Sequence, residues 1–317
     1  MADGCLVVYK PIGVTSHDVV NKIKHTYKVK CGHAGTLDPM AQGVLLIFMG
    51  KALKLINFIP AEHLDKTYLA RVTLGSTTDS YDATGNVTST YDGSTDYSEE
   101  ELDNAIKNFI GSFEQMPPAY SAIKIGGKKA YAMARAGEEV KLTPRPVHIT
   151  SIRTIKDYKE NDKHNLLLRV HCSRGTYIRS LAHDVGQKLG CGAHLSYLLR
   201  ERVGKWIYAD AFPYWKIEKG ISFENDPAFT DFSEVLSVPK IKIKKDAMMK
   251  VYNGMPLTKK DISSVQTSND EISELFQILS PEQKLIAVYS SNKTGKPSTT
   301  TEFKLYPMRV FHEDETD

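Results

Sequence analysis

The sequence predicts an α+β protein in two parts, a larger amino-terminal domain of strands and amphipathic helices followed by a small β-rich domain. Three observations lead to this prediction. The chain has 317 residues, which suits two domains better than one. Strand-like and helix-like hydrophobic patterns alternate up to about residue 204, and after Val238 short β-rich segments separated by turns replace them. We therefore expect the domains to span residues 1–237 and 238–317.

The amino-terminal domain begins with a strand, CLVVY, which the turn KPIG ends. A helix then starts at Thr15 or Ser16, because either hydroxyl can cap the free N–H groups of the first turn. Its apolar residues share one face and its lysines the other. Next come a strand expected at GVLLIFM, a helix at KALKLINFI and a half-buried strand at KTYLARVTLG, where apolar residues recur with a period of two.

Polar turns and amphipathic segments alternate over the next hundred residues. After the polar turn TTDSYDATGN, the segment SEEELDNAIKNFIGSF predicts a helix in which Ser98 and Glu101 form a capping box. PAYSAIKIGGKKAY predicts a strand, a glycine turn and the start of a short helix. Two strands, ITSIRTI and NLLLRVHC, then precede a helix over GTYIRSLAHDVGQKLG that ends at Gly190.

The pattern loosens into aromatic and polar loops over residues 205–237 and becomes β-rich after them. SSNKTGKPSTTT has the composition of a flexible loop. Strands are expected within the segments SVPKIKIK, YNGMPLT, FQILS, KLIAVYS and TEFKLYPMRVF.

Charge is distributed unevenly along the chain. The formal net charge is only +3, but residues 1–60 carry seven lysines against three acidic residues, whereas the final EDETD carries four acids. A basic lobe of this kind is suited to contact with a polyanion such as a nucleic acid. A solvated lysine face is the alternative interpretation.

Cysteine use and hydropathy narrow the class of protein. The four cysteines, Cys5, Cys31, Cys172 and Cys191, are scattered, which argues against a disulfide framework and against a structural zinc site. No apolar run approaches the ~20 residues of a membrane span, and MADGCLVVYK lacks the pattern of a signal peptide. We expect a cytoplasmic protein without a membrane partner.

Several segments resemble known nucleotide-binding or phosphatase motifs but differ from them at a required position or spacing. GVLLIFMGKA has six residues between its glycines and Ala52 where a Walker loop needs Ser or Thr. GCGAHL lacks the third glycine of a dinucleotide fingerprint. In HCSRGTYIRS, six residues separate Cys172 from Arg179, where phosphatase loops have five, and one extra residue redirects the N–H groups of an anion nest.

A second set of residues suits one kind of chemistry. Asp38 lies in the glycine-flanked turn GHAGTLDP, Tyr68 in the half-buried strand, and Arg179 near the start of a helix. A carboxylate can attack an electron-poor or glycosidic carbon, an arginine can keep it ionised, and a tyrosine can stack on a flat ring. Each residue also has an ordinary structural explanation, as a turn residue, a core aromatic or a salt-bridge partner. Their combination favours an enzyme that acts on a planar, anionic substrate.

Five segments of the chain, in order, resemble the TruB family of tRNA pseudouridine synthases. GHAGTLDPMAQGVL resembles the family's catalytic motif, and the match spans residues 5 to about 205. The region after Val238 resembles the small RNA-binding PUA domain more loosely. The other four segments are VVYKPIGVTSHDVV, KTYLARVTLGSTTDSYDATG, QMPPAYSAIKIGGKKAYAMARAG and CSRGTYIRSLAHDVGQKLGCGAHLSYLLR.

The resemblance implies a fold and an activity. The fold would be a catalytic domain with a mixed, largely antiparallel sheet flanked by helices, followed by a β-barrel-like PUA domain. The activity would be isomerisation of the uridine at position 55, in the T-loop of tRNA, to pseudouridine, with base flipping and with neither a cofactor nor a metal. The partner would be the T-arm of tRNA, and a monomer is expected.

The resemblance also implies roles for individual residues. Asp38 would be the nucleophile, and whether it attacks the base or the ribose is left open. Tyr68 would stack on the uracil and assist proton removal, and Arg179 would pair with the nucleophile. The residues implied to bind substrate are Asp82 in the charge network, Tyr177 and Leu198 in the uridine pocket, His33 as the residue that enters the T-loop, and the lysines Lys10 and Lys54, of which Lys10, with Pro11, supports the pocket rather than reacting.

Other functions remain open from the sequence. A noncatalytic protein that binds or folds tRNA on the same scaffold would not need Asp38, Tyr68 and Arg179 together. A relative that acts on guided RNA within a complex would favour long basic extensions, whereas this chain ends in acids. A phosphatase would depend on Cys172 instead of Asp38.

Overall fold

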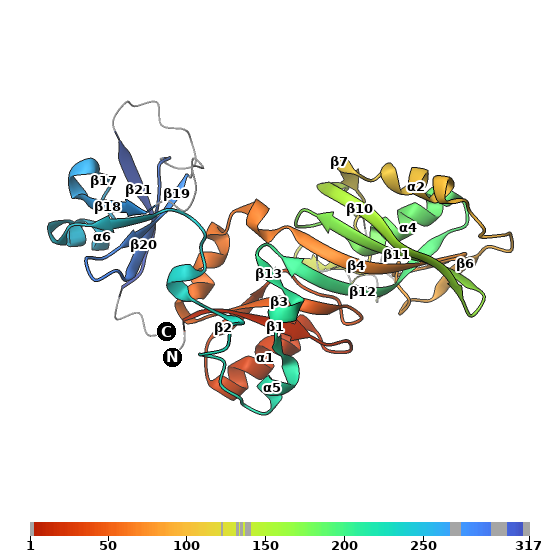
Figure 1. Cartoon of the computed structure of the whole chain (residues 1–317), viewed down its shortest axis with the longest axis horizontal. Coiled ribbons are helices and arrows are strands. Elements are labelled where there is room, and N and C mark those ends of the chain that lie inside the picture. The colour runs from red at the N-terminus through yellow and green to blue at the C-terminus, as the bar shows by residue number, and fades with distance from the viewer. Residues whose placement is uncertain are drawn as a thin grey trace.

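The protein is described here by a computed structural model, which covers residues 3–121, 123–130, 133, 136, 141–266, 274–292 and 303–312. Within these ranges the chain forms two main sheets (Figure 1). The larger one runs through the amino-terminal two thirds of the chain, and the smaller one lies to one side and is built from residues after 239.

The larger sheet has eleven strands among the described residues, eight of them in the order β14–β1–β3–β12–β4–β11–β10–β7. Strands β2, β13 and β15 pair with β3, β12 and β1. The β1–β14 and β3–β12 pairs are parallel and the others antiparallel, so the sheet is mixed and largely antiparallel, as expected. The strands are β1 (Gly4–Lys10), β2 (Cys31–Ala34), β3 (Gln42–Met49), β4 (Lys66–Leu74), β7 (Gly111–Gln115), β10 (Arg145–Glu160), β11 (Lys163–Cys172), β12 (Ala193–Val203), β13 (Trp206–Ile207), β14 (Phe212–Pro213) and β15 (Phe229–Asp231).

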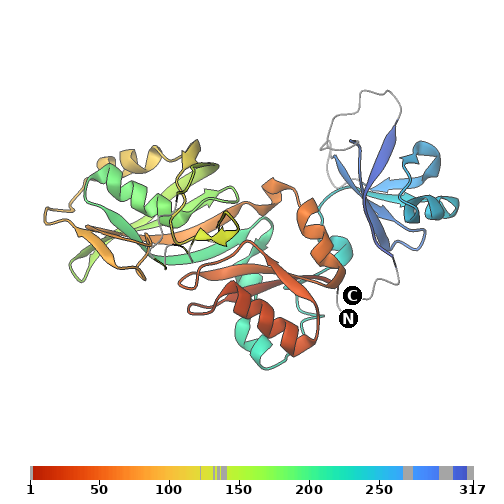
Figure 2. The same ribbon diagram turned by 180° about the vertical axis from the view of Figure 1, so that it is seen from behind.

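Helices cover different parts of this sheet. Helices α2 (Glu99–Lys107) and α4 (Ile178–Leu189) lie together over the half that contains β4, β10 and β11, as Figures 1 and 2 show from opposite sides. Helices α1 (Ser16–Tyr27) and α5 (Tyr214–Glu218) lie beside the half that contains β1 and β3. Each half therefore has its own apolar core, one around β1 and β3 and one beneath α2 and α4.

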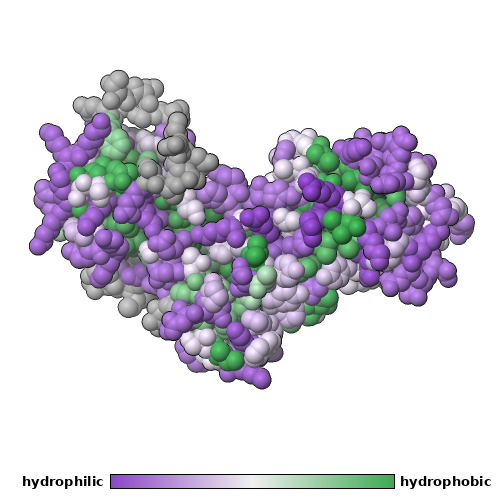
Figure 3. Space-filling view, viewed as in Figure 1, coloured by the Kyte–Doolittle hydropathy of each residue, from purple (hydrophilic) through white to green (hydrophobic). Residues whose placement is uncertain are grey.

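The smaller sheet has six strands among the described residues, in the order β17–β21–β20–β19–β16–β18, and its own apolar cluster. Residues on both sides of the expected boundary between 237 and 238 also belong to one apolar core, which contains Val235 and Leu236 together with Leu285 and Phe311. Figure 3 shows a surface that is hydrophilic over most of both ends of the molecule, with a broad notch between them. The elements of this part are β16 (Lys240–Ile243), α6 (Met248–Tyr252), β17 (Leu257–Thr258), β18 (Ile262–Gln266), β19 (Leu275–Leu279), β20 (Leu285–Ser290) and β21 (Lys304–Val310).

Local sequence signals located most elements correctly. Thr15 is the N-cap of α1, and Ser98 with Glu101 forms the expected capping box of α2. In β4, Tyr68, Ala70 and Val72 are buried while the residues between them are partly exposed. Helix α4 ends at the left-handed Gly190.

Some expectations were wrong in detail. The segment 50–58 is a 3₁₀ helix, η1 (Gly50–Phe58), instead of an α-helix. Helix α2 ends at Lys107, because a turn follows and Gly111 at φ 107° starts strand β7. Strands β12 and β18 and helix α6 were not expected from the pattern. The two-stranded pieces are β5 (Ser76–Thr78) with β6 (Val87–Thr90), and β8 (Lys124–Ile125) with β9 (Lys128–Lys129).

Three expectations fall on residues outside the described ranges. These are most of the short helix after KKAY, most of the SSNKTGKPSTTT loop and the acidic EDETD end. The domain boundary between residues 237 and 238 stays a prediction. None of the helices among the described residues is long and apolar enough to span a membrane.

Helix α4 packs so closely on β12 that Gly186 has no room for a side chain. A Cβ atom on Gly186 would lie 2.1 Å from the backbone nitrogen of Ala193. Glycine is ordinarily the weaker helix former by about 1 kcal/mol. We predict that Gly186→Ala nevertheless lowers the free energy of unfolding by about 1–3 kcal/mol, the usual cost of overpacking.

Urea denaturation measures this effect, with Gln187→Ala as the control on the exposed face of the same helix. The control is expected to change stability by less than about 0.5 kcal/mol. A Gly186→Ala protein as stable as the parent would mean that the helix and the strand can move apart freely.

Candidate active site

The turn that carries Asp38 is fastened to the start of α1. The hydroxyl of Ser16 donates to the carbonyl of Leu37 at 3.0 Å and accepts from the Leu37 N–H at 2.9 Å. Ser16 and Leu37 are both buried, and the N–H of Gly13 donates to the carbonyl of Pro39 at 2.8 Å. The opening segment of the chain thus holds the turn on both sides of Asp38.

Asp38 faces Arg179 from α4. Arg179 Nη2 donates to Asp38 Oδ1 at 3.2 Å, and Arg179 Nε lies 3.0 Å from Asp38 Oδ2. The Arg179 side chain is 5% exposed and that of Asp38 37% exposed, so the guanidinium is buried and the carboxylate is open on one side. Removal from water raises the pKa of Asp38 above its usual value, and the Arg179 charge opposes the rise.

Arg179 is held in turn by a loop and a second carboxylate. Its Nη1 donates to the carbonyl of Ser80 at 3.2 Å and lies 3.5 Å from Asp82 Oδ2, while its Nη2 donates to the carbonyl of Tyr120 at 3.0 Å. Asp82 is itself buried and accepts hydrogen bonds from Ser80 and Thr84. Two segments, the loop with Ser80 and Asp82 and the segment at Tyr120, therefore fix the guanidinium that Asp38 faces.

The loop with Ser80 and Asp82 is braced against the next turn of α4. Tyr81 has a left-handed backbone, φ 61°, and its ring stacks on His183 with centroids 4.0 Å apart and planes at 15°. Burial lowers the pKa of His183, so the stacked imidazole favours the neutral form. Burial raises the pKa of the neighbouring Asp184 carboxyl to about 6.

The amide side chain of Gln115 forms hydrogen bonds with the backbone at the start of α4. Gln115 is 2% exposed, its Oε1 accepts from the backbone N–H of Tyr177 at 2.8 Å, and its Nε2 donates to the Tyr177 carbonyl at 3.0 Å. Ser180 also donates to the carbonyl of Met116 at 2.7 Å. These bonds set the position of Tyr177 and of the N–H groups in the first turn of α4.

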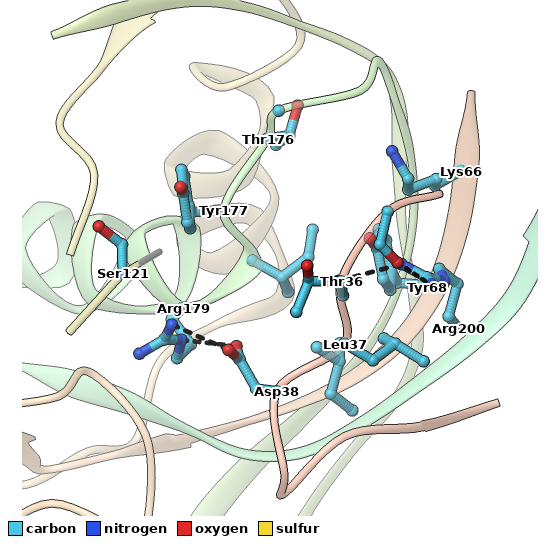
Figure 4. Close-up of a pocket in the computed structure, with 14 residues that line it drawn as sticks. Thr36, Leu37, Asp38, Lys66, Tyr68, Ser121, Thr176, Tyr177, Arg179 and Arg200 are labelled. Carbon is cyan, nitrogen blue, oxygen red and sulfur yellow. Dashed lines mark hydrogen bonds and ion pairs between the residues drawn. The ribbon is translucent and has the colours of Figure 1, made fainter. Parts of the chain in front are cut away.

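A cavity of about 270 Å³ opens beside Asp38 (Figure 4). It is smaller than the ~300 Å³ at the lower end of pockets for drug-sized ligands, a size suited to one small planar group. Five of the residues singled out in the sequence line it, namely Asp38, Tyr68, Tyr177, Arg179 and Leu198. The other lining residues are Gly35, Thr36, Leu37, Lys66, Ser121, Gly175, Thr176, Ile178 and Arg200.

Two buried cations stand beside Tyr68 on the cavity wall. Arg200 is fully buried, and its guanidinium donates to the carbonyls of Val44, Gly35 and Thr36. Lys66 is 8% exposed, and burial lowers its pKa to about 8. Burial raises the pKa of the Tyr68 phenol to about 12, so it stays protonated at neutral pH.

Four of the expected site residues do not line the cavity. Asp82 lies behind Arg179, and Lys10 is fully buried with its ammonium donating to the carbonyls of Pro11 and Val14. His33 lies on β2, and its buried Nδ1 has no hydrogen-bond partner among the residues that the structure describes. Lys54 lies on η1.

Four residues of the site were not predicted from the sequence, namely Gln115, Ser16, Lys66 and Arg200. Gln115 and Ser16 lie within segments that resemble family motifs, but nothing in their own spacing marks them as braces. Lys66 was identifiable, because it is a lysine at an inward position of a strand that alternates with a period of two.

Two alternative chemistries gain no support from the geometry. Cys172 is fully buried, and desolvation raises the pKa of its thiol to about 11, which disfavours the thiolate that a phosphatase nucleophile needs. Within the described ranges, no group of three or more His, Cys, Asp or Glu side chains is placed to hold a metal ion.

Comparison with known proteins identifies close relatives. A family model described as TruB family pseudouridylate synthase (N terminal domain) matches residues 22–178. The chain is 34% identical to a protein named tRNA pseudouridine synthase B from Oceanobacillus iheyensis, over 97% of this chain and 97% of that one. A protein of the same name from Bacillus pumilus is 37% identical over 93% of this chain and 94% of that one.

Solved structures share the fold over nearly the whole chain. A chain in the crystal structure of a Cbf5–Nop10–Gar1 complex superposes with a TM-score of 0.67 at 27% identity, covering 98% of this chain and 85% of that one. A chain in the structure of an H/ACA RNP bound to a substrate RNA containing 2'-deoxyuridine gives a TM-score of 0.66 at 25% identity, covering 98% and 86%.

The two hydrogen bonds between Ser16 and Leu37, referred to as the clamp, lead to a prediction about stability. Ser16→Ala leaves the buried N–H and carbonyl of Leu37 without their partner, and a buried unsatisfied group costs about 1–3 kcal/mol. We expect a loss of that size in the free energy of unfolding, measured with urea. Ser264→Ala, at an exposed position of β18, is the matched control and should have little effect. An equal effect of both substitutions would show that the clamp contributes nothing.

The raised pKa of Asp184 predicts a pH-dependent effect. The folded pKa of about 6 exceeds the ordinary 3.8, so the contribution to stability is complete below 3.8 and lost as pH rises through 6. Asp184→Asn should therefore stabilise the protein at pH 7.5, by about 1 kcal/mol once solvent screening of the half-buried group is allowed for.

Urea denaturation at pH 7.5, 6 and 4.5 tests this, and the gain should shrink as the pH is lowered. Asp103→Asn on α2, where the carboxylate is 49% exposed, is the control and should show no such trend. A constant difference between Asp184→Asn and the parent across the three pH values would contradict the prediction.

Proposed function

The chain belongs to the TruB family of pseudouridylate synthases, and from that premise we propose how it isomerises a uridine of tRNA to pseudouridine. The single observation that carries the proposal is the Asp38 carboxylate, held by Arg179 at the wall of a cavity that Tyr68 also lines. A carboxylate that is fixed, paired and open on one side is suited to covalent catalysis.

The reaction balances within the uridine itself. The bond between N1 and C1′ breaks, the base turns, and a bond forms between C5 and C1′. The hydrogen that C5 loses is matched by the one that N1 gains. Neither an oxidant nor a reductant enters, so the tasks of the protein are to extract the base, to hold it and to supply a nucleophile.

Asp38 is proposed as that nucleophile. Arg179 keeps it oriented by two contacts to the two carboxylate oxygens and opposes the effect of burial on its pKa. Attack on C6 of the base and attack on C1′ of the ribose are both compatible with a carboxylate at this position. Asp82 keeps Arg179 in place and acts through it.

Tyr68 is proposed as the platform for the uracil ring. Its side chain is buried among the residues beneath the cavity, and base–aromatic stacking contributes about 1–3 kcal/mol, which offsets the cost of taking a base out of its stack. With a pKa of about 12 the phenol is neutral before reaction, so any role in removing the C5 proton is transfer along a hydrogen bond. Tyr177 and Leu198 close the sides of the pocket.

The substrate is proposed to enter as the uridine at position 55, in the T-arm of tRNA. His33 would occupy the space that the flipped base leaves, and Lys54 would hold the RNA backbone, with Lys10 supporting the turn from below. Residues 238–317 would form a PUA-like domain that extends the contact with the same tRNA. We further propose a cytoplasmic monomer.

Asp38→Asn tests the proposal most directly. Single-turnover conversion of a T-arm RNA hairpin is measured by nucleoside chromatography after digestion, with RNA binding measured in parallel. The parent should convert the hairpin, and the variant should bind it equally well but react at least about 1,000-fold more slowly, as expected for the loss of a nucleophile. Asp103→Asn is the matched control with an unchanged rate.

The opposite results have definite meanings. If the parent binds the hairpin without converting it, the protein is an RNA-binding or RNA-folding protein on this scaffold. If Asp38→Asn converts at the parental rate, another group is the nucleophile.

A further inference from the structure

Lys66 is a buried cation that the proposed mechanism does not use. It is 8% exposed and lines the cavity from β4. Across the described ranges, its ammonium group forms no hydrogen bond or ion pair. An ammonium with little access to water and no partner is costly, so its position on the cavity wall calls for an anionic or strongly accepting group that arrives with the substrate.

The neighbouring cation is already committed to the fold. Arg200 donates to three backbone carbonyls and so holds the strand β3 and the turn at residues 35 and 36. The end of the Lys66 stem lies beside the same turn, because a Cβ atom on Gly35 would be 3.5 Å from Lys66 Cε. The three N–H groups of Lys66 are thus the ones available to a bound molecule.

The position of Lys66 relative to Tyr68 indicates which part of the substrate it meets. The two residues are two positions apart on one strand, so their side chains emerge on the same face about 7 Å apart. In Figure 4, Lys66 and the Asp38–Arg179 pair lie at opposite ends of the side chains around the cavity. A flat ring on Tyr68 with its glycosidic atom toward Asp38 therefore turns its far edge toward Lys66.

The far edge of uracil carries a carbonyl oxygen in both substrate and product. In uridine the ring atom opposite N1 is C4, which bears O4. In pseudouridine the atom opposite C5 is C2, which bears O2. Turning the ring about the line through N3 and C6 exchanges N1 with C5 and O4 with O2, so one fixed donor serves both.

We propose that the Lys66 ammonium donates a hydrogen bond to this far-edge carbonyl of the uracil and stabilises the negative charge that develops on the base. The proposal rests on the proposed function. If the bond between N1 and C1′ breaks first, its electron pair stays on the base and spreads to the carbonyl oxygens. If Asp38 adds to C6 first, the electron pair of the C5–C6 double bond moves to O4. In either case the proton stays on Lys66.

The burial of Lys66 argues for a base carbonyl over a backbone phosphate as its partner. A phosphodiester has chain on both sides and must stay at the cavity mouth, whereas Lys66 is more than nine-tenths buried. With its pKa near 8, the group is still mainly charged at pH 7. A fixed donor aimed at developing charge is worth about 100- to 1,000-fold in rate in other enzymes.

The test is a cycle of one protein change and one atom change in the RNA. Lys66→Met removes the charge with little change in side-chain length, and 4-thiouridine or 2-thiouridine at the target replaces O4 or O2 by sulfur, a weaker acceptor. Single-turnover rates and RNA affinities are measured for both proteins with all three hairpins. Lys163→Met, an exposed lysine at the turn between β10 and β11, is the matched control with parental rates.

The expected result is a loss of about 100-fold for Lys66→Met on uridine with unchanged RNA affinity. The rate loss caused by the thio substitution should differ at least tenfold between the parent and Lys66→Met. The difference should appear with 4-thiouridine if the rate-limiting step precedes the turning of the ring, and with 2-thiouridine if that step follows it. Lys66→Gln keeps a hydrogen-bond donor without the charge, so its rate on uridine should lie between those of the parent and Lys66→Met. It replaces Lys66→Met in the cycle if the methionine variant does not fold.

Three results would overturn the proposal. Parental rates for Lys66→Met would show that Lys66 does not act on the base. Equal thio effects in parent and variant for both substrates would make its role structural. A loss of RNA affinity that accounts for the whole effect would assign Lys66 to the backbone phosphate. In all three the parent converts uridine, whereas failure of the parent itself would count against the proposed function.

Discussion

The burial of the Arg179 guanidinium is the constraint on which the rest of the site depends. A guanidinium cannot shed its charge in a protein, so each N–H group taken out of water needs an acceptor. Asp38, Ser80 and Tyr120 supply acceptors for Nη1 and Nη2 from segments 141, 99 and 59 residues away, and Nε makes an ion-pair contact with Asp38. The turn with Asp38, the loop after β5 and the segment after β7 must therefore all reach the same point on α4. A fold that failed to bring them together would leave a buried cation unpaired, at a cost of several kcal/mol.

That requirement explains why helix α4 is so firmly placed. Gln115 binds both backbone groups of Tyr177 at its start, Gly186 lets its middle touch β12, and the Tyr81–His183 stack joins it to the loop that holds Asp82. Each contact fixes the helix in a different direction. The bidentate contact between Asp38 and Arg179 needs this rigidity, since a shift of one turn or one residue would break it. The half-open carboxylate is then the part of the network that is left accessible to substrate.

Local patterns in the sequence predicted the elements but not the braces between them. The caps at Thr15 and Ser98, the alternation along β4 and the stop at Gly190 are properties of neighbouring residues, so they could be read directly. The resemblance to a family added Asp38, Tyr68 and Arg179 as a set. Gln115 and Arg200 form hydrogen bonds with residues 62 and 156 positions away in the sequence. Nothing in the segments around them indicates which distant residue they bind. Residues 50–58 likewise pack against β1, β2 and β3, and local periodicity did not distinguish their 3₁₀ form from an α-helix.

The two ends of the cavity differ in charge, and this difference suits the proposed reaction in both orientations of the uracil ring, before and after it turns. At one end two carboxylates, Asp38 and Asp82, share the single guanidinium of Arg179, so this end carries no net positive charge and offers a carboxylate oxygen as an electron donor. At the other end Lys66 is a net positive charge beside Arg200, in a site where little water screens it. In the proposed reaction, electron density would move from the Asp38 end toward the Lys66 end as the base is attacked or released. Because uracil presents a carbonyl to the far end before and after it turns, the donor proposed at Lys66 would serve both orientations of the ring from one position.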